Sequence, residues 1–210
     1  MINKDTKLYC SFSLNPGNNG CNFFNRAFEE KNINAIYKSF YSDNIKKSID
    51  AVKTLNIFGF AISMPFKIET LDYVDEISTE VEHIGACNTV LNNEGYLIAY
   101  NTDFYGVKKY IEKLENKIDF LYILGKGGFS KSIQYVCKIM NIDYEVIDRQ
   151  SWNKLYNLKN EWIFNATPID INNQFNFLID GRPFTTEGKS IALNQSMKQF
   201  KIYTGIDYDQ

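Results

Sequence analysis

FLYILGKGGFSKSIQYVCKIM, residues 120–140, is the stretch that decides the fold. It opens with an apolar run typical of a buried strand, continues through the glycine loop GKGGFSKS and ends in a helical pattern. A tight glycine turn between strand and helix lets backbone N–H groups approach a pyrophosphate. We therefore predict that Gly125, Gly127 and Gly128 bind the phosphates of a dinucleotide.

The next strand of such a unit should end in a residue that contacts the adenosine ribose. YEVIDR (144–149) reads as that strand, and Asp148 follows Gly125 by 23 residues, near the roughly 20 expected. Asp148 suits a ribose 2′-hydroxyl and Arg149 suits a 2′-phosphate. The pair leaves NAD and NADP both open, and the loop taken alone is equally explained as an ordinary glycine-rich turn.

Strand and helix patterns alternate along the rest of the chain, which indicates an α/β protein. We expect a helix capped by Ser42 and a hairpin over 87–103 that turns at NNEG. A domain boundary is placed near the helix at 104–116. The other expected strands are 7–14, 35–41, 57–64 and 161–168, and the other helices are 21–31 and 188–204, the last ending at Gly205.

Composition excludes several functional classes. The chain has 210 residues, 44% hydrophobic and 23% charged, with a net charge of −2, so neither nucleic acid nor an anionic membrane is an expected partner. No apolar run approaches the roughly 20 residues that span a bilayer. The start lacks the apolar core of a signal peptide, so we expect a cytoplasmic protein. Four cysteines without a CxxC pair, beside one histidine, predict no metal site.

Five further motifs occur in a particular order around the glycine loop. They are SMPFK (63–67), GACNTV (85–90), YNTDFYG (100–106), FNATP (164–168) and a terminal helix with Gln195. Together, and nearly end to end, the chain resembles the shikimate dehydrogenase family. SFSLNPGNNGCNFFNRAF (11–28) and QFKIYTG (199–205) resemble its shikimate dehydrogenase-like branch.

The resemblance implies an N-terminal α/β substrate domain and a C-terminal Rossmann-like domain that binds NADP or NAD. It implies the reversible reduction of 3-dehydroshikimate to shikimate, a step of aromatic amino acid (chorismate) biosynthesis. The developing alkoxide needs a proton and a positive partner, and the resemblance gives these roles to Lys67, with Asp103 orienting the lysine. It further implies substrate contacts from Ser63, Asn88 and Gln195, and cofactor contacts from Asn165 and Thr167.

The resemblance also divides the chain. Residues 1–103 correspond to the substrate-binding and catalytic domain, and 104–187 to a reduced Rossmann-like domain. Residues 188–210 correspond to a helix that returns to the substrate domain.

Two departures from the family pattern bear on function. The loop that carries two carboxylate-binding serines in the family has Asn18 and Gly20 here, and Asn18 is the remaining donor.

The cofactor half is also short, because only about a dozen residues separate Arg149 from FNATP, room for one or two helical turns. FLIDGRPFTTEG (177–188) is interpreted as a collapsed version of the family's next strand, substrate segment and helix. A shortened sheet leads to the hypothesis of a homodimer that covers its edge.

Three functions remain open at this point. The first is an NAD(P)-dependent oxidoreductase acting on a hydroxylated cyclic carboxylate such as shikimate or quinate. The second is a catalytically degenerate relative that binds substrate without hydride transfer. The third is a subunit of a pathway assembly that uses its shortened half as an interface.

Overall fold

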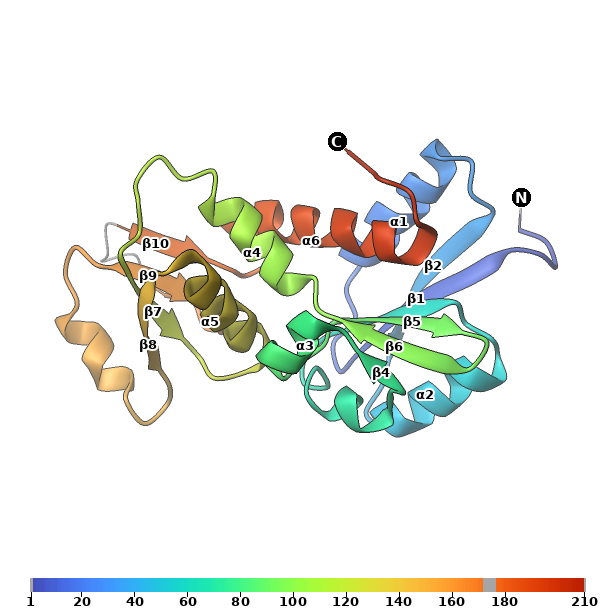
Figure 1. Cartoon of the computed structure of the whole chain (residues 1–210), viewed down its shortest axis with the longest axis horizontal. Coiled ribbons are helices and arrows are strands. Elements are labelled where there is room, and N and C mark those ends of the chain that lie inside the picture. The colour runs from blue at the N-terminus through green and yellow to red at the C-terminus, as the bar shows by residue number, and fades with distance from the viewer. Residues whose placement is uncertain (1, 172–176, 210) are drawn as a thin grey trace. The chain divides into compact units, whose positions relative to one another are not determined.

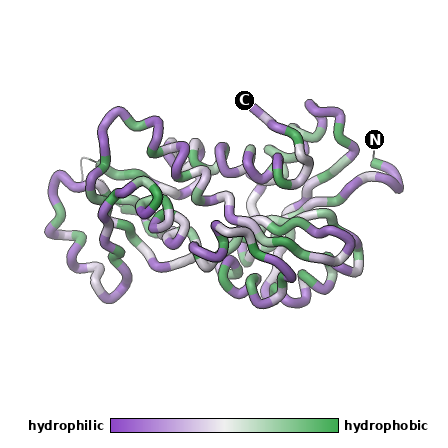
Figure 2. The backbone as a smooth tube through the Cα atoms, viewed as in Figure 1, coloured by the Kyte–Doolittle hydropathy of each residue, from purple (hydrophilic) through white to green (hydrophobic). Residues whose placement is uncertain are grey.

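The computed structural model describes residues 2–171 and 177–209, which form two compact units. Unit 1 comprises residues 1–102 and 196–210, and unit 2 comprises residues 103–195. The long helix α6 (Thr186–Thr204) contributes its earlier turns to unit 2 and the turns from Ser196 onward to unit 1. The strands of both sheets consist mostly of hydrophobic residues, and most of the loops consist of hydrophilic residues (Figure 2).

Unit 1 is built on a six-stranded mixed sheet in the order β2-β1-β3-β5-β6-β4 (Figure 1). The first three strands are parallel, and β5 and β6 form the predicted hairpin. Glu94 and Gly95 both have positive φ in its turn, as a tight hairpin turn requires. The strands are β1 (Lys7–Ser13), β2 (Ala35–Tyr41), β3 (Gly59–Ile62), β4 (Glu76–Ile77), β5 (Thr89–Asn93) and β6 (Tyr96–Tyr100).

Two hydrophobic clusters cover this sheet. In one, α2 (Ile45–Thr54) packs Ile45, Ile49 and Val52 against strand residues such as Phe60. In the other, α1 (Asn19–Glu30) and the end of α6 pack an aromatic cluster that includes Phe28. Burial of that many large apolar side chains supplies the main driving force for folding of the unit.

Local hydrogen bonds correct one sequence prediction. Ser42 does not cap α2, because the Asn44 side chain accepts from the Lys47 backbone N–H at 3.0 Å. Ser42 instead accepts at its hydroxyl from the Asn44 backbone N–H. The elements η1 (Glu69–Tyr73) and α3 (Thr79–Ile84), together with β4, were not predicted. The stretch of chain that forms them is short, and its apolar residues do not recur at a regular spacing. The sequence pattern therefore did not indicate these elements.

Unit 2 is a four-stranded parallel sheet in the order β10-β9-β7-β8. The predicted strand–glycine–helix unit is confirmed, and α5 lies over the sheet (Figure 1). Both the α/β class and the Rossmann-like half are therefore as predicted. The strands are β7 (Phe120–Leu124), β8 (Asp143–Ile147), β9 (Trp162–Asn165) and β10 (Phe177–Asp180), and the helices are α4 (Asp103–Ile111), α5 (Gly128–Met140) and η2 (Trp152–Asn157).

The short connections behave largely as the sequence indicates. The segment between β8 and β9 holds only η2, a single 3-10 helix. The segment 177–188, interpreted from the sequence as collapsed, begins with β10, a regular strand paired with β9. Residues 172–176, which precede it, lie outside the described residues. Gly205 has φ +74 and its N–H donates to the Lys201 carbonyl, so it ends α6 as predicted.

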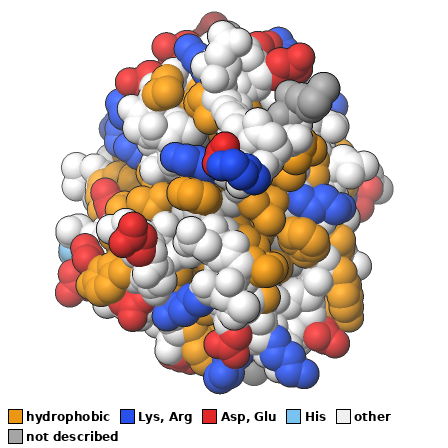
Figure 3. All heavy atoms as spheres, turned by 90° about the vertical axis from the view of Figure 1, so that its right-hand side faces the viewer, with side chains coloured by type: hydrophobic (Ala, Val, Ile, Leu, Met, Phe, Trp, Pro, Cys, Tyr) orange, Lys and Arg blue, Asp and Glu red, His pale blue; other side chains and the backbone are white. Residues whose placement is uncertain are grey.

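Charge is mixed on the face shown in Figure 3, where lysine, arginine and acidic side chains alternate with exposed hydrophobic ones. No helix in the described ranges combines the length and the hydrophobicity that crossing a bilayer requires.

Candidate functional site

The SMPFK turn holds a half-buried lysine at the carboxyl end of β3. Phe66 is 4% exposed and lies in the core beneath the turn, whereas Ser63 and Pro65 are exposed. The Lys67 carbonyl accepts from the Cys87 backbone N–H at 2.8 Å. Phe66 therefore anchors the turn, and Cys87 fixes the Lys67 main chain beside the GACNTV segment.

Asn88, the residue after Cys87, is buried and organises a polar network within unit 1. Its Oδ1 accepts from the Thr102 backbone N–H at 2.7 Å, and its Nδ2 donates to Thr102 Oγ1 at 3.0 Å. Thr89 Oγ1 also donates to Asn88 Oδ1, and Gln199 Nε2 donates to Thr89 Oγ1 at 2.8 Å. Asn88 thus ties the hairpin to the residue that precedes Asp103.

Removing this network is expected to destabilise unit 1. Asn88→Ala leaves the buried Thr102 N–H without its acceptor, which should lower the free energy of unfolding by about 1–3 kcal/mol. Urea denaturation followed by far-UV circular dichroism measures the change. Asn22→Ala, at an exposed position of α1, is the matched control and should not lower stability, because alanine has the higher helix propensity. An Asn88→Ala variant as stable as the control would show that the network contributes nothing.

Asp103 and Gln195 both lie in unit 2. Asp103 is the first residue of α4 and is 1% exposed, a position at which the helix N-terminus favours a carboxylate. Gly106 follows one turn later, and a Cβ there would lie 2.5 Å from the Ile191 carbonyl oxygen and 3.2 Å from Gln195 Cβ. Glycine therefore allows α4 and α6 to pack closely, and Gln195 lies against the first turns of α4.

Asn18 lies in the loop that follows β1 and is exposed at the start of α1, where its side chain makes no capping hydrogen bond. Ser63, after β3, donates its backbone N–H to the Phe12 carbonyl of β1. Because β1 and β3 are parallel neighbours, Asn18 and Ser63 both follow carboxyl strand ends at one edge of the sheet. Ligands of open α/β sheets commonly bind at such edges.

The glycine loop joins β7 to α5 and combines a positive φ with a helix N-terminus that has no side-chain cap. Gly125 follows β7 with φ +102, which L-residues rarely adopt, and a Cβ there would lie 2.9 Å from Thr167 Cγ2. Gly127 is the N-cap of α5 without a side-chain cap, and a Cβ there would meet nothing within 4 Å. The helix N-terminus therefore faces open space with backbone donors, and the residues present fit a pyrophosphate.

Asn165 and Thr167 build the loop after β9. Asn165 is fully buried, and its Oδ1 accepts from the Thr167 backbone N–H at 3.0 Å and from Thr167 Oγ1 at 2.7 Å. Its Nδ2 donates to the Ile169 carbonyl. Chain order reverses between β7 and β9, so this loop and the glycine loop border the switch point where dinucleotides bind.

A side chain at residue 125 is expected to weaken the binding of a nucleotide at the glycine loop. Gly125→Val forces a β-branched residue to positive φ and drives its Cβ against Thr167, so Kd for a reduced nicotinamide nucleotide should rise at least about tenfold. Nicotinamide fluorescence titration gives this Kd. Gly17→Ala, where an added Cβ meets nothing within 4 Å, is the control. Unchanged affinity in Gly125→Val would exclude the loop as the binding site.

A charged cluster lies at the carboxyl end of β10, at the same edge of the sheet as the glycine loop. Arg182 Nε donates to Asp180 Oδ2 at 2.9 Å, and its Nη2 donates to Asp170 at 2.6 Å. Hydrogen bonding to Asp180 is the main cause that raises the pKa of Arg182 above its usual range. Asn165 Nδ2 lies 3.4 Å from Asp180 Oδ1, so the cluster joins the end of β10 to the loop after β9.

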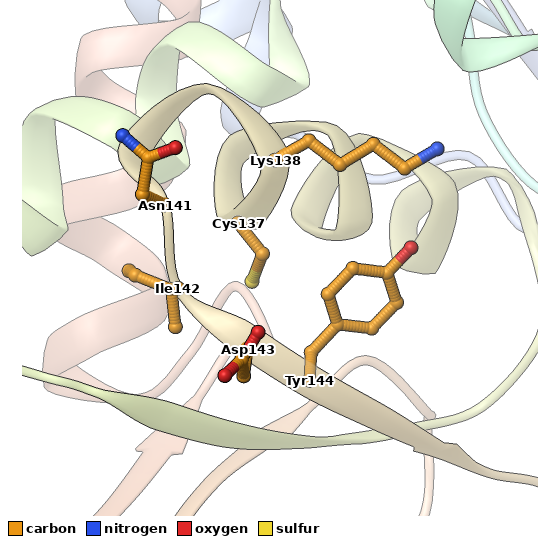
Figure 4. A pocket seen from close by; sticks show the side chains of 6 residues that line it. All are labelled: Cys137, Lys138, Asn141, Ile142, Asp143 and Tyr144. Atoms are coloured by element: carbon orange, nitrogen blue, oxygen red, sulfur yellow. The ribbon is translucent and has the colours of Figure 1, made fainter.

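A shallow hollow of about 370 Å³ lies elsewhere in unit 2 (Figure 4). It is lined by the end of α5 and the start of β8, including Lys138 and Tyr144. This is the amino end of β8, opposite to the edge with the glycine loop, so it is not the predicted cofactor site.

Sequence patterns missed several polar residues of these sites. Gln199 is buried and lies one helical turn after Gln195, so its i+4 spacing was the available signal. Thr102 directly precedes Asp103, but nothing in its local sequence indicates the Asn88 partner. Lys126, Asp180 and Arg182 were also missed, because each makes a contact with the loop that follows another strand.

Comparison with known proteins agrees with this geometry. Residues 19–90 match the shikimate dehydrogenase substrate binding domain. The chain is similar to shikimate dehydrogenases in sequence and in fold. It is 41% identical over 134 residues to a shikimate dehydrogenase-like protein of Haemophilus influenzae, a match covering 63% of this chain and 49% of the relative. It is 37% identical over 152 residues to a shikimate dehydrogenase (NADP(+)) of Pyrococcus furiosus, covering 68% and 54%.

The matched segments span about half of the length of these curated relatives. Structural similarity extends further. A solved shikimate 5-dehydrogenase-like protein superposes with a TM-score of 0.81 at 28% identity, covering 100% of this chain and 96% of the other. The fold of both units is therefore that of this family.

Proposed function

We propose that this protein is an NAD(P)-dependent oxidoreductase that reversibly reduces 3-dehydroshikimate to shikimate or a closely related hydroxylated cyclic carboxylate. The observation that carries the proposal is the half-buried Lys67, held by Cys87 beside the Asn88 network in a chain similar to shikimate dehydrogenases. The fold also retains the glycine loop at the switch point of a parallel sheet.

Residue roles follow from the chemistry of a ketone. When bound, NAD(P)H supplies the hydride. Lys67 donates the proton to the carbonyl oxygen and its positive charge opposes the charge that develops there. Asp103 orients the lysine. Asn18, Ser63, Asn88 and Gln195 hold the hydroxyl and carboxylate groups of the substrate, and the glycine loop with Asn165 and Thr167 holds the cofactor. Residues 1–103, 104–187 and 188–210 serve as substrate domain, cofactor domain and returning helix.

The first experiment is a titration of the purified protein with NADPH and with NADH, followed by reduced-nicotinamide fluorescence, with and without shikimate. We expect saturable binding of at least one nucleotide and shikimate oxidation in the presence of its oxidised form. Binding without turnover on shikimate or quinate would remove the reductase assignment and keep the nucleotide site.

A second candidate function is a relative that binds substrate without hydride transfer. The single 3-10 helix between β8 and β9 favours it, because a full helix at that point would cover more of the sheet. This candidate predicts shikimate binding by calorimetry and no binding of either nucleotide. Saturable nucleotide binding would exclude it.

We also propose a homodimer, because the sheet of unit 2 has open edges. The four-stranded sheet of unit 2 leaves β8 and β10 as edges, and an open edge can be covered by another chain. Light scattering is expected to give twice the mass of one chain, and a monomer at micromolar concentration would contradict this.

A further inference from the structure

Arg182, in the turn after β10, binds two carboxylates that differ greatly in exposure. Its Nε and Nη2 donate to Asp180 Oδ2 at 2.9 and 2.6 Å, and Nη2 also donates to Asp170 Oδ1 at 2.6 Å. The Arg182 and Asp180 side chains are 12% and 8% exposed, whereas that of Asp170 is 83% exposed. A buried guanidinium, fixed in orientation by Asp180, therefore binds one exposed carboxylate in the loop after β9.

The loop after β9, residues 166–171, is held at two points. Near its start, Asn165 Oδ1 accepts from the Thr167 backbone N–H at 3.0 Å and from Thr167 Oγ1 at 2.7 Å. Near its end, Asp170 accepts from Arg182. The first point belongs to the strand that precedes the loop, and the second belongs to the neighbouring strand β10. Arg182 therefore fixes the end of the loop that Asn165 does not reach.

The loop after β9 lies against the glycine loop. Gly125 has φ +102, and a Cβ there would lie 2.9 Å from Thr167 Cγ2 and 3.4 Å from the Ala166 carbonyl oxygen. The Ala166 N–H donates to the Leu124 carbonyl at 3.0 Å. A displacement of residues 166–171 would therefore change the wall that the glycine loop faces.

The glycine loop has a different neighbour on each side. On one side β8 ends, followed by Asp148 and the exposed Arg149, and Asp148 Oδ2 lies 3.9 Å from Nζ of Lys126 in the glycine loop. On the other side lie β9 and the loop after it. A dinucleotide bound across the switch point has its adenosine ribose at the end of β8, so its nicotinamide half extends over β9.

We propose that Arg182 is a positioning residue for the nicotinamide half of the cofactor, acting through Asp170 and the loop after β9. The inference rests on the proposed function and adds a residue that acts on the cofactor through another residue. A loop that is already fixed loses less conformational entropy when a ligand binds to it, so the affinity is higher. The adenosine and pyrophosphate groups, at β8 and the glycine loop, do not depend on this ion pair.

Equilibrium binding of the reduced nucleotide and of its adenosine fragment tests the proposal without reference to turnover. Asp170→Ala should raise Kd for NADH, or for NADPH if that is the nucleotide bound, by about three- to tenfold, as expected when one or two side chains must be ordered on binding. Kd for ADP, or for 2′-phospho-ADP in the second case, should change by less than about twofold. Asp170→Glu keeps the carboxylate and should restore most of the affinity. Nicotinamide fluorescence and calorimetry give these constants.

Asp119→Ala is the matched control for Asp170→Ala. Asp119 is 79% exposed and pairs with Lys117 at 2.6 Å, the same distance as in the Asp170–Arg182 pair, but it directly precedes β7 at the opposite edge of the sheet. Both variants remove one exposed carboxylate from unit 2, and exposed ion pairs contribute little to stability. Both should keep the melting temperature of the unaltered protein, and the control should also keep both Kd values.

Each outcome decides the question. An unchanged Kd for the reduced nucleotide in Asp170→Ala overturns the inference alone. Equal weakening of nucleotide and adenosine fragment also overturns it, because a general loss of structure in unit 2 would produce that result. Arg182→Met should weaken nucleotide binding at least as much as Asp170→Ala, and if it does not melt cooperatively, Asp170→Ala decides. If the unaltered protein binds neither nucleotide, the proposed function fails and the inference fails with it.

Discussion

Replacing Lys67 with methionine is expected to lower kcat for shikimate oxidation by about 10²- to 10⁴-fold, the usual contribution of general acid–base catalysis. The side chain lies in a turn anchored by Phe66, which is 4% exposed, and its main chain is held by Cys87. Methionine keeps the length and apolar stem of lysine, so the turn should persist while the proton donor is lost. Steady-state kinetics gives kcat, and fluorescence titration should show an unchanged Kd for the reduced nucleotide.

Lys46→Met is the matched control for this change. Lys46 lies on α2 in the same unit and pairs with Asp50 at the surface, where ion pairs contribute little. It should keep full activity. A Lys67→Met enzyme with kcat within about threefold of the unaltered protein, small against the expected loss, would remove Lys67 from the reaction and with it the proposed mechanism.

Phe164→Ala is expected to lower the free energy of unfolding of unit 2 by about 3–5 kcal/mol, through lost burial and the cavity that remains. Phe164 is fully buried in β9, and its ring centroid lies 5.9 Å from that of Phe129 in an edge-on arrangement. A Cβ on Gly181 would lie 2.9 Å from the same ring. The ring thus supports both the first turn of α5 and the turn after β10.

Both tryptophans of the chain, Trp152 and Trp162, lie in unit 2, so their fluorescence follows its unfolding in urea selectively. Phe120→Ala, at a position of β7 that is 38% exposed, is the control and should lower the free energy of unfolding far less. A loss below about 1 kcal/mol in Phe164→Ala would mean that the neighbouring rings collapse into the space, and the site would not depend on this packing.

Much of the fold follows from local sequence patterns. The apolar runs, the glycine loop and the hairpin turn predict the class and most elements, because each reflects a backbone preference or a period of a few residues. The strand over 35–41 has the predicted bounds. The two-residue strand β4 and the short helix α3 were not predicted, because they contain too few residues to show a regular spacing of apolar residues.

The candidate site was predictable in its motifs and not in its contacts. Lys67, Asn88 and Asp103 were found from their order along the chain, and their assigned roles stay predictions. Gln199 was not found, although it donates to Thr89 across 110 positions of sequence. Such a partner is chosen by which helix face meets the sheet, and no pattern in a single segment records that choice.

The sequence by itself determined that a glycine turn follows an apolar strand, that a lysine follows another, and that an aspartate and an arginine end a third. These are properties of neighbouring residues. Tertiary structure decided which partners within the protein several of the polar groups contact. Asn88 holds Thr102, Asn165 holds Thr167, and the amides after Asp148 bind its carboxylate. Buried polar groups must find partners, and which partners are in reach depends on how strands and loops pack.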